Sequence, residues 1–396
     1  MAEALSTFLC AMVARLGVDD ALKVAMTSPE GTPSPMTTNQ ADAEQRKLQA
    51  FVSEYYGRLL ASSADLKTNA CCAGGAPPPW ITSRLAKVHP DVASRFYGCG
   101  FPIPQGLRGA TVVDLGCGTG RDVFVIAQLV GPDGLVHGID MTEEQLSLAR
   151  DTSGWHAEGF GYPKPNTAFH RGYVEDLRSV GIADASVDVV VSNCVVNLSP
   201  RKDLVLAEVF RVLKPGGELY ISDVFVDRRL PPEVASDPVL YAECLGGALY
   251  QADFVSLARR AGFLDPRVVS ASPISIQHDE ISSRVGAARF SSVTYRLFKL
   301  DGLDEQCEDY GQSVVYRGGI EGAESVFWLD DHHAFERGRP ERVCANTSAM
   351  LSSTRFAPWF DVIGARETHY GVFPCGPTMA AAQYASSGPA AGGACC

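Results

Sequence analysis

The 396-residue sequence predicts an α/β protein with a parallel-sheet core, followed by a smaller C-terminal β-containing domain. Three observations lead to this prediction. From about residue 110 to residue 230, runs rich in β-branched residues alternate with helical patterns, which is typical of βαβ units with right-handed crossovers. A glycine-rich turn follows the first of these runs. Beyond Ala271 the pattern changes to short strand-like runs separated by turns.

Residues 1–45 are expected to form a flexible leader, because segment 27–42 is rich in Ser, Thr and Pro and has no period. Glu3 stands where a secretory signal would carry positive charge, and no run approaches the ~18 apolar residues of a membrane helix. The net charge of −12, without a long basic run, disfavours nucleic acid as a partner. We therefore expect a cytoplasmic monomer that binds neither nucleic acid nor a membrane.

The ordered elements are predicted one after another along the chain. A helix over 51–66 ends before the prolines at 77–79, which cannot continue it. The core is then predicted as strand 111–116, helix 122–130, strand 135–140, helix 142–150, strands 167–172 and 187–193, helix 201–213 and strand 217–225. Short strands are expected in RLFKL (296–300), SVVYRG (313–318) and ESVFWLD (324–330).

The glycine turn, VVDLGCGTGRD at 112–122, lies between a strand and a helix, as a nucleotide-binding loop requires. Its glycines are Gly116, Gly118 and Gly120, whereas a dinucleotide fingerprint needs its third glycine at the position of Arg121. The spacing therefore disfavours NAD and FAD. Glycines at 116 and 118 let the backbone pass close to a smaller ligand.

Two acids accompany this turn. Asp114 precedes the glycines and is suited to face a positive amino group. Asp140 ends the second strand, twenty residues past Gly120, where an acid commonly accepts hydrogen bonds from a ribose diol. A GxGxG motif alone is often an ordinary tight turn, but the strand before it and the strand-terminal acid favour a cofactor site.

This constellation resembles the class I S-adenosylmethionine-dependent methyltransferases, and RVLKPGGELYISD at 211–223 resembles the segment leading into their fifth strand. The resemblance implies a Rossmann-like fold with S-adenosylmethionine as methyl donor. It also implies that Met141 packs on the adenine, that Val174 and Glu175 flank it, and that Asn193 lies below the methionine moiety.

A cysteine, Cys194, follows the predicted strand 187–193, and Cys244 lies in ECLGGALY. Two thiols near a sulfonium suit a soft acceptor, since thiolates select thiophilic centres. A free cysteine is also among the most buried residue types, so a packing role for Cys194 alone is equally open. Cys117 fits the turn as a small residue. The remaining thiols Cys10, Cys307, Cys344 and Cys375 have no partner in the pattern and are interpreted as packing or surface residues.

Four cysteine contexts, TNAC, FYGC, SNCVVNL and ECLGGALY, contain Cys71, Cys99, Cys194 and Cys244, at separations of 28, 95 and 50 residues. With GRDVFVIAQLVG and GIDMT, they resemble the arsenic(III) S-adenosylmethionine methyltransferases from about residue 55 to 298, and more weakly to 360. The resemblance implies methyl transfer to thiol-bound arsenite, then to methylarsenite, in arsenic detoxification.

The same resemblance implies the roles of the thiols. Cys194 and Cys244 hold As(III), whereas Cys71 and Cys99 help to bind it or form a disulfide during turnover, to be reopened by glutathione or thioredoxin. Because Cys72 adjoins Cys71, only the TNAC context assigns the first thiol. Tyr97 either faces the sulfonium or simply packs.

The predicted domain boundaries follow from the motifs and the resemblance. After the leader we expect a Rossmann-like domain over 46–230, an arsenic-binding segment over 231–289, a C-terminal domain over 290–375 and a disordered tail over 376–396 that ends in Cys395 and Cys396. Two alternatives remain. One is a C- or O-methyltransferase of quinone or sterol type with incidental cysteines, and the other is a non-enzymatic arsenic-buffering protein.

Overall fold

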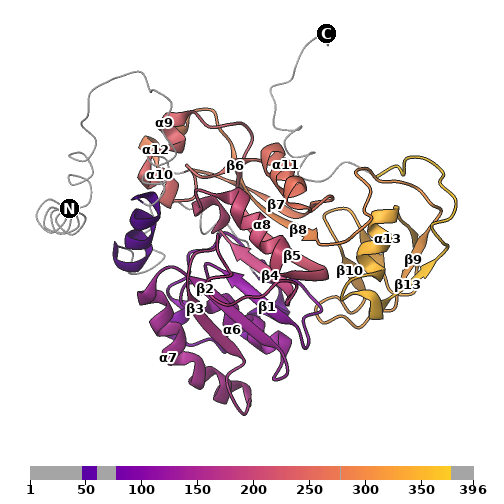
Figure 1. Cartoon of the computed structure of the whole chain (residues 1–396), viewed down its shortest axis with the longest axis horizontal. Coiled ribbons are helices and arrows are strands. Elements are labelled where there is room, and N and C mark those ends of the chain that lie inside the picture. Colours follow the sequence, from indigo (N-terminus) through magenta and orange to yellow (C-terminus); the bar gives the residue numbers. More distant parts are fainter. Residues whose placement is uncertain (1–46, 60–76, 277, 376–396) are drawn as a thin grey trace, which may run out of the picture. The chain divides into compact units, whose positions relative to one another are not determined.

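The structure is a computed structural model that describes residues 47–59, 77–276 and 278–375 (Figure 1). The leader predicted over 1–45, the thiols Cys71 and Cys72, and the predicted tail over 376–396 lie outside the described residues. In the part that is described, no helix is both long and apolar enough to cross a membrane.

An eight-stranded sheet forms the core, in the order β3-β2-β1-β4-β5-β8-β7, with β6 paired to β5. The strands β3, β2, β1, β4 and β5 pair with one another in parallel. Strand β8 pairs antiparallel with both β5 and β7. The strands are β1 (Thr111–Leu115), β2 (Leu135–Asp140), β3 (Thr167–Arg171), β4 (Val187–Asn193), β5 (Leu213–Val226), β6 (Leu249–Tyr250), β7 (Arg267–Ile274) and β8 (Phe290–Phe298). The α/β class with a mostly parallel sheet is confirmed.

Both faces of the sheet are covered, so its central strands are hydrophobic on both sides. The neighbours Val112 and Val113 show this, because Val112 packs into the core under α4, α6 and α7 and Val113 into the core under α8 and α11. These helices are α4 (Pro79–Leu85), α6 (Arg121–Val130), α7 (Glu143–Phe160), α8 (Lys202–Val212) and α11 (Gln251–Ala261).

Helix α7 extends ten residues past the predicted end at 150. The prediction ended too early because the apolar period fades after residue 150, although polar side chains beyond it still pack. Thr152 and His156 are both buried on this extension. The imidazole Nδ1 of His156 lies 2.8 Å from the Thr152 carbonyl oxygen, and its Nε2 accepts the His89 backbone N–H at 3.0 Å. The ring therefore ties α7 to the start of α5 (Pro90–Ala93).

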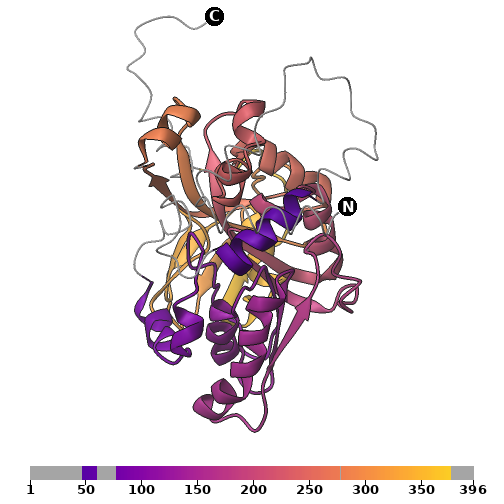
Figure 2. The same ribbon diagram turned by 90° about the vertical axis from the view of Figure 1, so that its left-hand side faces the viewer.

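The helical segment 47–59 ends in a π-helical turn, η1 (Tyr55–Leu59). Figure 2 shows this segment in indigo, and it lies beside the start of α7, where the Gln145 side-chain amide donates to the Tyr56 carbonyl at 2.8 Å. From the same turn, the Tyr55 hydroxyl donates to the Glu243 carboxylate at 2.5 Å and the Tyr56 hydroxyl to the Ala242 carbonyl at 2.7 Å. The segment therefore contacts the chain directly before Cys244.

The C-terminal region, drawn in yellow in Figure 1, has its own apolar core. It contains a three-stranded sheet in the order β12-β9-β13 and a two-stranded sheet of β10 and β11. Its elements are β9 (Ser313–Tyr316), β10 (Val326–Trp328), β11 (Ala334–Glu336), β12 (Pro340–Arg342), α13 (Ala345–Ser352) and β13 (Phe360–Ile363). The region begins after Phe298 and not at residue 290, because strand β8, including most of RLFKL, completes the main sheet.

Buried charge joins the C-terminal region to the main sheet. Glu218 of β5 accepts from Arg296 of β8 at 2.7 Å and also pairs with Arg355, which follows α13. Arg296 donates in addition to the Leu329 carbonyl at 2.5 Å. Glu218 and Arg296 are fully buried and Arg355 is largely so, which makes the carboxylate and the two guanidinium groups depend on one another for partners.

Candidate active site

The glycine turn after β1 forms the floor of a pocket at the carboxyl edge of the sheet. Gly116, Gly118 and Gly120 have φ angles of +66°, +54° and +87°, in the left-handed region that favours glycine. Close approach adds a second requirement at Gly116, where a Cβ would lie 2.3 Å from the Val195 side chain. The turn thus holds the loops after β1 and β4 together.

Three acids surround this turn. Asp140 accepts the backbone N–H groups of Gly118 and Thr142, each at 2.8 Å. Asp114 is buried, and burial together with the nearby Asp122 and Asp140 raises the pKa of its carboxyl well above the ordinary value. A ligand carrying positive charge would relieve this repulsion, so the site fits the ammonium and sulfonium groups of S-adenosylmethionine.

Asn193 at the end of β4 connects the pocket to the segment that carries Cys99. Its Nδ2 donates to the Asp122 carboxylate and to the Gly100 carbonyl, both at 3.0 Å, and its Oδ1 accepts the Cys99 backbone N–H at 3.0 Å. Gly98 must be small, because a Cβ there would lie 2.6 Å from the Asn193 amide carbon. Asn193 therefore fixes residues 98–100 against the strand end.

The pocket brings together every residue predicted to contact the cofactor. Its lining includes Tyr97, Asp114, Gly116, Gly118, Asp140, Met141, Val174, Glu175 and Asn193, and also Cys194. The individual contacts of these residues with S-adenosylmethionine stay predictions. Sequence reasoning missed Asp122, Val195 and Ser199, which also line the pocket; the Ser199 hydroxyl donates to Glu175 at 2.5 Å. Asp122 could have been found from the sequence, because it is an acid that directly follows Arg121 at the start of α6.

Three of the four predicted arsenic-site thiols lie in one buried cluster. Cys99 and Cys194 form a disulfide, and the Cys244 thiol donates to the Cys194 carbonyl at 3.5 Å. All three pack among apolar residues such as Val224 and Leu240. The resemblance implied Cys71 as a disulfide partner of Cys99; in the structure Cys99 bonds to Cys194 instead, and Cys71 lies outside the described residues.

The backbone at two of these thiols is strained. Cys194 has φ +57° and Cys244 has φ +62°, and among the described residues Ala185 alone joins them as a non-glycine residue with positive φ. Such conformations cost about 1–3 kcal/mol each and persist where the surrounding structure fixes them, often at functional sites. The Cys194 N–H is held by the Ser222 carbonyl at 2.9 Å and the Cys244 N–H by the Tyr241 carbonyl at 3.0 Å.

Two titratable groups, Lys202 and Asp223, lie beside the thiol cluster. Lys202 donates to the carbonyls of Asn197 and Ser199 at 3.0 and 2.9 Å, and burial lowers its pKa to about 8, although Asp223 and Cys244 oppose this shift. Burial raises the pKa of Asp223 to about 7. A lysine with such surroundings supplies positive charge near Cys244, which favours a thiolate. Sequence reasoning missed both residues.

The comparisons with known proteins agree with this geometry. Residues 107–262 match a family model described as a methyltransferase domain, and residues 310–389 match the arsenite methyltransferase C-terminal domain. An arsenite methyltransferase of Aquipseudomonas alcaligenes is 56% identical over 326 residues, covering 82% of this chain and 94% of that protein. The arsenite methyltransferase of Mus musculus is 45% identical over 81% of this chain and 85% of its own length.

Among solved structures, an arsenic(III) S-adenosylmethionine methyltransferase from Chlamydomonas reinhardtii matches with a TM-score of 0.74 and 50% identity, covering 75% of this chain and all of that chain. The fold and the pocket define a class I methyltransferase. With these relatives at this coverage, the chain belongs to the arsenite methyltransferase family and is an S-adenosylmethionine-dependent enzyme of arsenic methylation.

Proposed function

We propose that this enzyme methylates As(III) bound to Cys99, Cys194 and Cys244, directly beside the cofactor pocket. The single observation that carries the proposal is the convergence of these thiols from three segments onto one cluster, with Cys194 also lining the pocket. Three sulfurs suit trivalent arsenic, whose lone pair occupies the remaining position. Cys194 and Cys244 keep the roles expected from the resemblance, and Cys99 supplies the third sulfur.

The pocket residues would hold S-adenosylmethionine in a defined orientation. Asp140 takes the ribose, Met141 and Val174 pack on the adenine with Glu175, and Asp114 and Asn193 lie near the methionine end, with Tyr97 toward the sulfonium. When bound, S-adenosylmethionine supplies an electrophilic methyl group. The arsenic lone pair is the nucleophile, so the chain needs no general base, and its residues contribute positioning and exclusion of water.

The redox balance assigns a role to the thiols after transfer. Attack by the lone pair formally converts As(III) to As(V), and two electrons from two thiolates restore As(III) while a disulfide forms. The bond between Cys99 and Cys194 supports this pair as one such disulfide. We propose that glutathione or thioredoxin reopens it by thiol exchange. By resemblance, Cys71 would help to bind As(III) or form a disulfide during turnover. We also propose a cytoplasmic location, where such thiol pools are found, and a monomer.

The test is mass analysis of products from As(III), glutathione and isotopically labelled S-adenosylmethionine. We expect labelled methylarsenicals, and full loss of product after alkylation of the thiols. A quinone- or sterol-type methyltransferase would keep activity toward its own acceptor after alkylation. A buffering protein would bind As(III) stoichiometrically without consuming the cofactor. Either outcome would overturn the proposal.

A second experiment tests the disulfide. Enzyme freed of external thiol should perform at most a single round of methylation, and peptide mapping should then find Cys99 linked to Cys194. Continued turnover without any reductant would refute the redox scheme. A Cys71 to Cys99 linkage after that round would return Cys71 to the position expected from the resemblance.

A further inference from the structure

A second group of thiols lies in the C-terminal region, outside the pocket. The sulfur atoms of Cys307, Cys344 and Cys375 all lie within 4.8 Å of one another. Cys344 is fully buried, whereas Cys307 and Cys375 are partly exposed. The sequence spacing suggested no partnership among them, and the earlier interpretation as separate packing or surface thiols does not describe this arrangement.

Backbone hydrogen bonds hold the three segments that carry these thiols. The Phe373 N–H donates to the Cys307 carbonyl at 2.7 Å, and the Cys375 N–H to the Phe373 carbonyl at 2.8 Å. The Ala345 N–H, next to Cys344, donates to the Glu308 carbonyl at 2.9 Å. The scaffold therefore fixes the cluster without a disulfide among the three cysteines, so little ordering is needed when a ligand binds.

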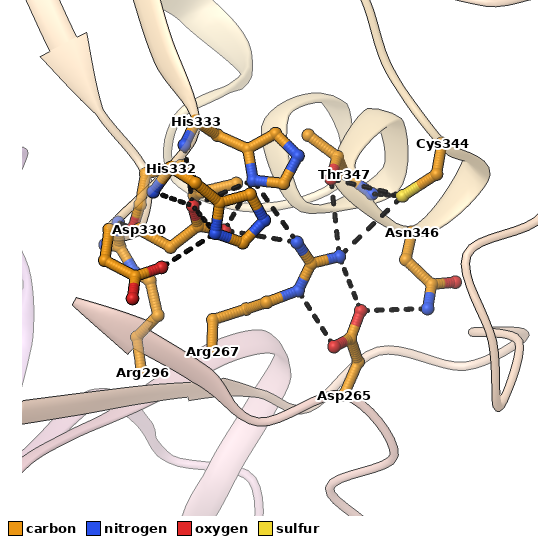
Figure 3. Close-up of polar contacts among 11 residues, drawn as sticks. Asp265, Arg267, Arg296, Asp330, His332, His333, Cys344, Asn346 and Thr347 are labelled. Carbon is orange, nitrogen blue, oxygen red and sulfur yellow. Dashed lines mark hydrogen bonds and ion pairs between the residues drawn. The ribbon is translucent and has the colours of Figure 1, made fainter. Parts of the chain in front are cut away.

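The surroundings of Cys344 favour a thiolate. Its sulfur caps α13, accepting the Thr347 backbone N–H at 3.5 Å, and the Arg267 guanidinium lies 3.7 Å away (Figure 3). A thiolate at a helix N-terminus beside a guanidinium is a strong soft ligand.

A neighbouring group of possible ligands is already engaged. Asp330, His332 and His333 also lie close together, but the Asp330 carboxylate pairs with Arg267 at 3.1 Å and contacts His333 Nδ1 at 2.8 Å (Figure 3). Arg267 is itself fixed by Asp265 at 2.7 Å. These groups therefore orient the guanidinium toward Cys344, and the sulfur group is left to bind a ligand.

We propose that Cys307, Cys344 and Cys375 form a second binding site for trivalent arsenic, separate from the thiols beside the cofactor. Three sulfurs match As(III), whereas a structural zinc site takes four ligands. Arsenite binds by exchange, because each sulfur replaces one hydroxyl group: two leave as water with the protons of Cys307 and Cys375, the one replaced by the Cys344 thiolate takes a proton from solvent, and no electron is transferred. The partly exposed Cys307 and Cys375 provide the entry, and the buried Cys344 completes the site.

The experiment measures arsenic bound per chain in the reduced full-length protein. A background variant replaces by Ser the other thiols assigned to arsenic or able to compete for it: Cys71, Cys72, Cys99, Cys194, Cys244, Cys395 and Cys396. On this background, equilibrium dialysis with arsenite should find one equivalent, and X-ray absorption should find three sulfur neighbours. Adding Cys307→Ser with Cys375→Ser, at partly exposed positions that tolerate the change, should lower arsenite affinity by at least about tenfold.

Two comparisons make the result decisive. Cys344→Ser should have the same effect, whereas Cys117→Ser, at another buried thiol, should leave arsenite affinity unchanged. Unchanged affinity in the double variant, or a background that takes up zinc but no arsenite, would overturn the inference. This assay is independent of methylation, so failure of the second site and failure of the proposed function give different results.

Discussion

The two thiol groups of this protein have different surroundings. The group beside the cofactor pocket lies in an apolar cluster, with left-handed backbone at Cys194 and Cys244 and Lys202 as the nearby positive charge. The C-terminal group lies against Arg267 and the N-terminus of α13. A catalytic site must release its product, and strained, apolar surroundings limit how tightly it binds. Direct contact of a thiolate with a guanidinium and a helix N-terminus instead favours retention. We therefore propose turnover at the first group and storage at the second.

The largest expected effect comes from removing a thiol beside the cofactor. Cys194→Ser or Cys244→Ser replaces a soft thiolate by a hard hydroxyl, so methylation of both arsenite and a monomethyl arsenical should fall below detection. Binding of S-adenosylmethionine should remain, as measured by calorimetry, and Cys10→Ser serves as the control for a thiol outside both groups. Retained methylation in either variant would reverse the assignment and leave Cys194 as a small buried residue.

The next effect concerns the link between the two regions. Glu218→Gln leaves the buried Arg296 and the largely buried Arg355 without their carboxylate, so the free energy of unfolding should fall by about 3–5 kcal/mol. Glu336→Gln removes an exposed ion pair with Arg339 and should cost about 0–1 kcal/mol. Urea unfolding followed by circular dichroism measures both. Similar losses in the two variants would contradict a buried ionic link.

A smaller effect tests the acids that distinguish the pocket from the C-terminal group. Asp140→Ala should weaken S-adenosylmethionine binding by about 1.5–3 kcal/mol, or about 10- to 150-fold, because hydrogen bonds to a charged acceptor are lost. Arsenite binding at both thiol groups should survive. Asp151→Ala, on the exposed face of α7, is the matched control. Unchanged cofactor affinity in Asp140→Ala would show that the ribose is held elsewhere.

Sequence patterns predicted the pocket better than the thiol chemistry around it. The glycine turn, Asp140 and Cys194 follow strands at one sheet edge, so local patterns and the parallel topology bring them together. The C-terminal thiols come from segments joined by long-range backbone hydrogen bonds, and no local sequence pattern indicates such contacts. Strand β8 was assigned to the wrong region for the same reason, because pairing with β5 decides its place. The contact of Tyr55 with Glu243, 188 residues apart, also has no local signal.

The smallest effect compares the two regions in acid. In the methyltransferase half, burial lowers the pKa of His156 to about 4 from 6.5, and the ring must accept the His89 N–H while neutral. Protonation therefore favours the unfolded state: this stability is full above pH 6.5 and is lost as the pH falls through 4. In the C-terminal region, hydrogen bonding and charge from His333, with Arg267, hold the pKa of Asp330 below its ordinary value. The stability that the Asp330 carboxylate contributes is therefore full above pH 3.8 and is lost only at lower pH.

The contribution of His156, taken as the difference between wild type and His156→Gln in urea unfolding, should accordingly fall by about 1–3 kcal/mol between pH 6.5 and 4, the range for an unsatisfied buried donor. His156→Gln should be less stable than the wild type at pH 7 but show a flatter pH dependence in that window. Asp330→Asn should keep the wild-type slope there, because its carboxylate titrates at lower pH. If His156→Gln retains the full slope, another group in the methyltransferase half carries the acid sensitivity, and the neutral His156 is not what separates the two regions.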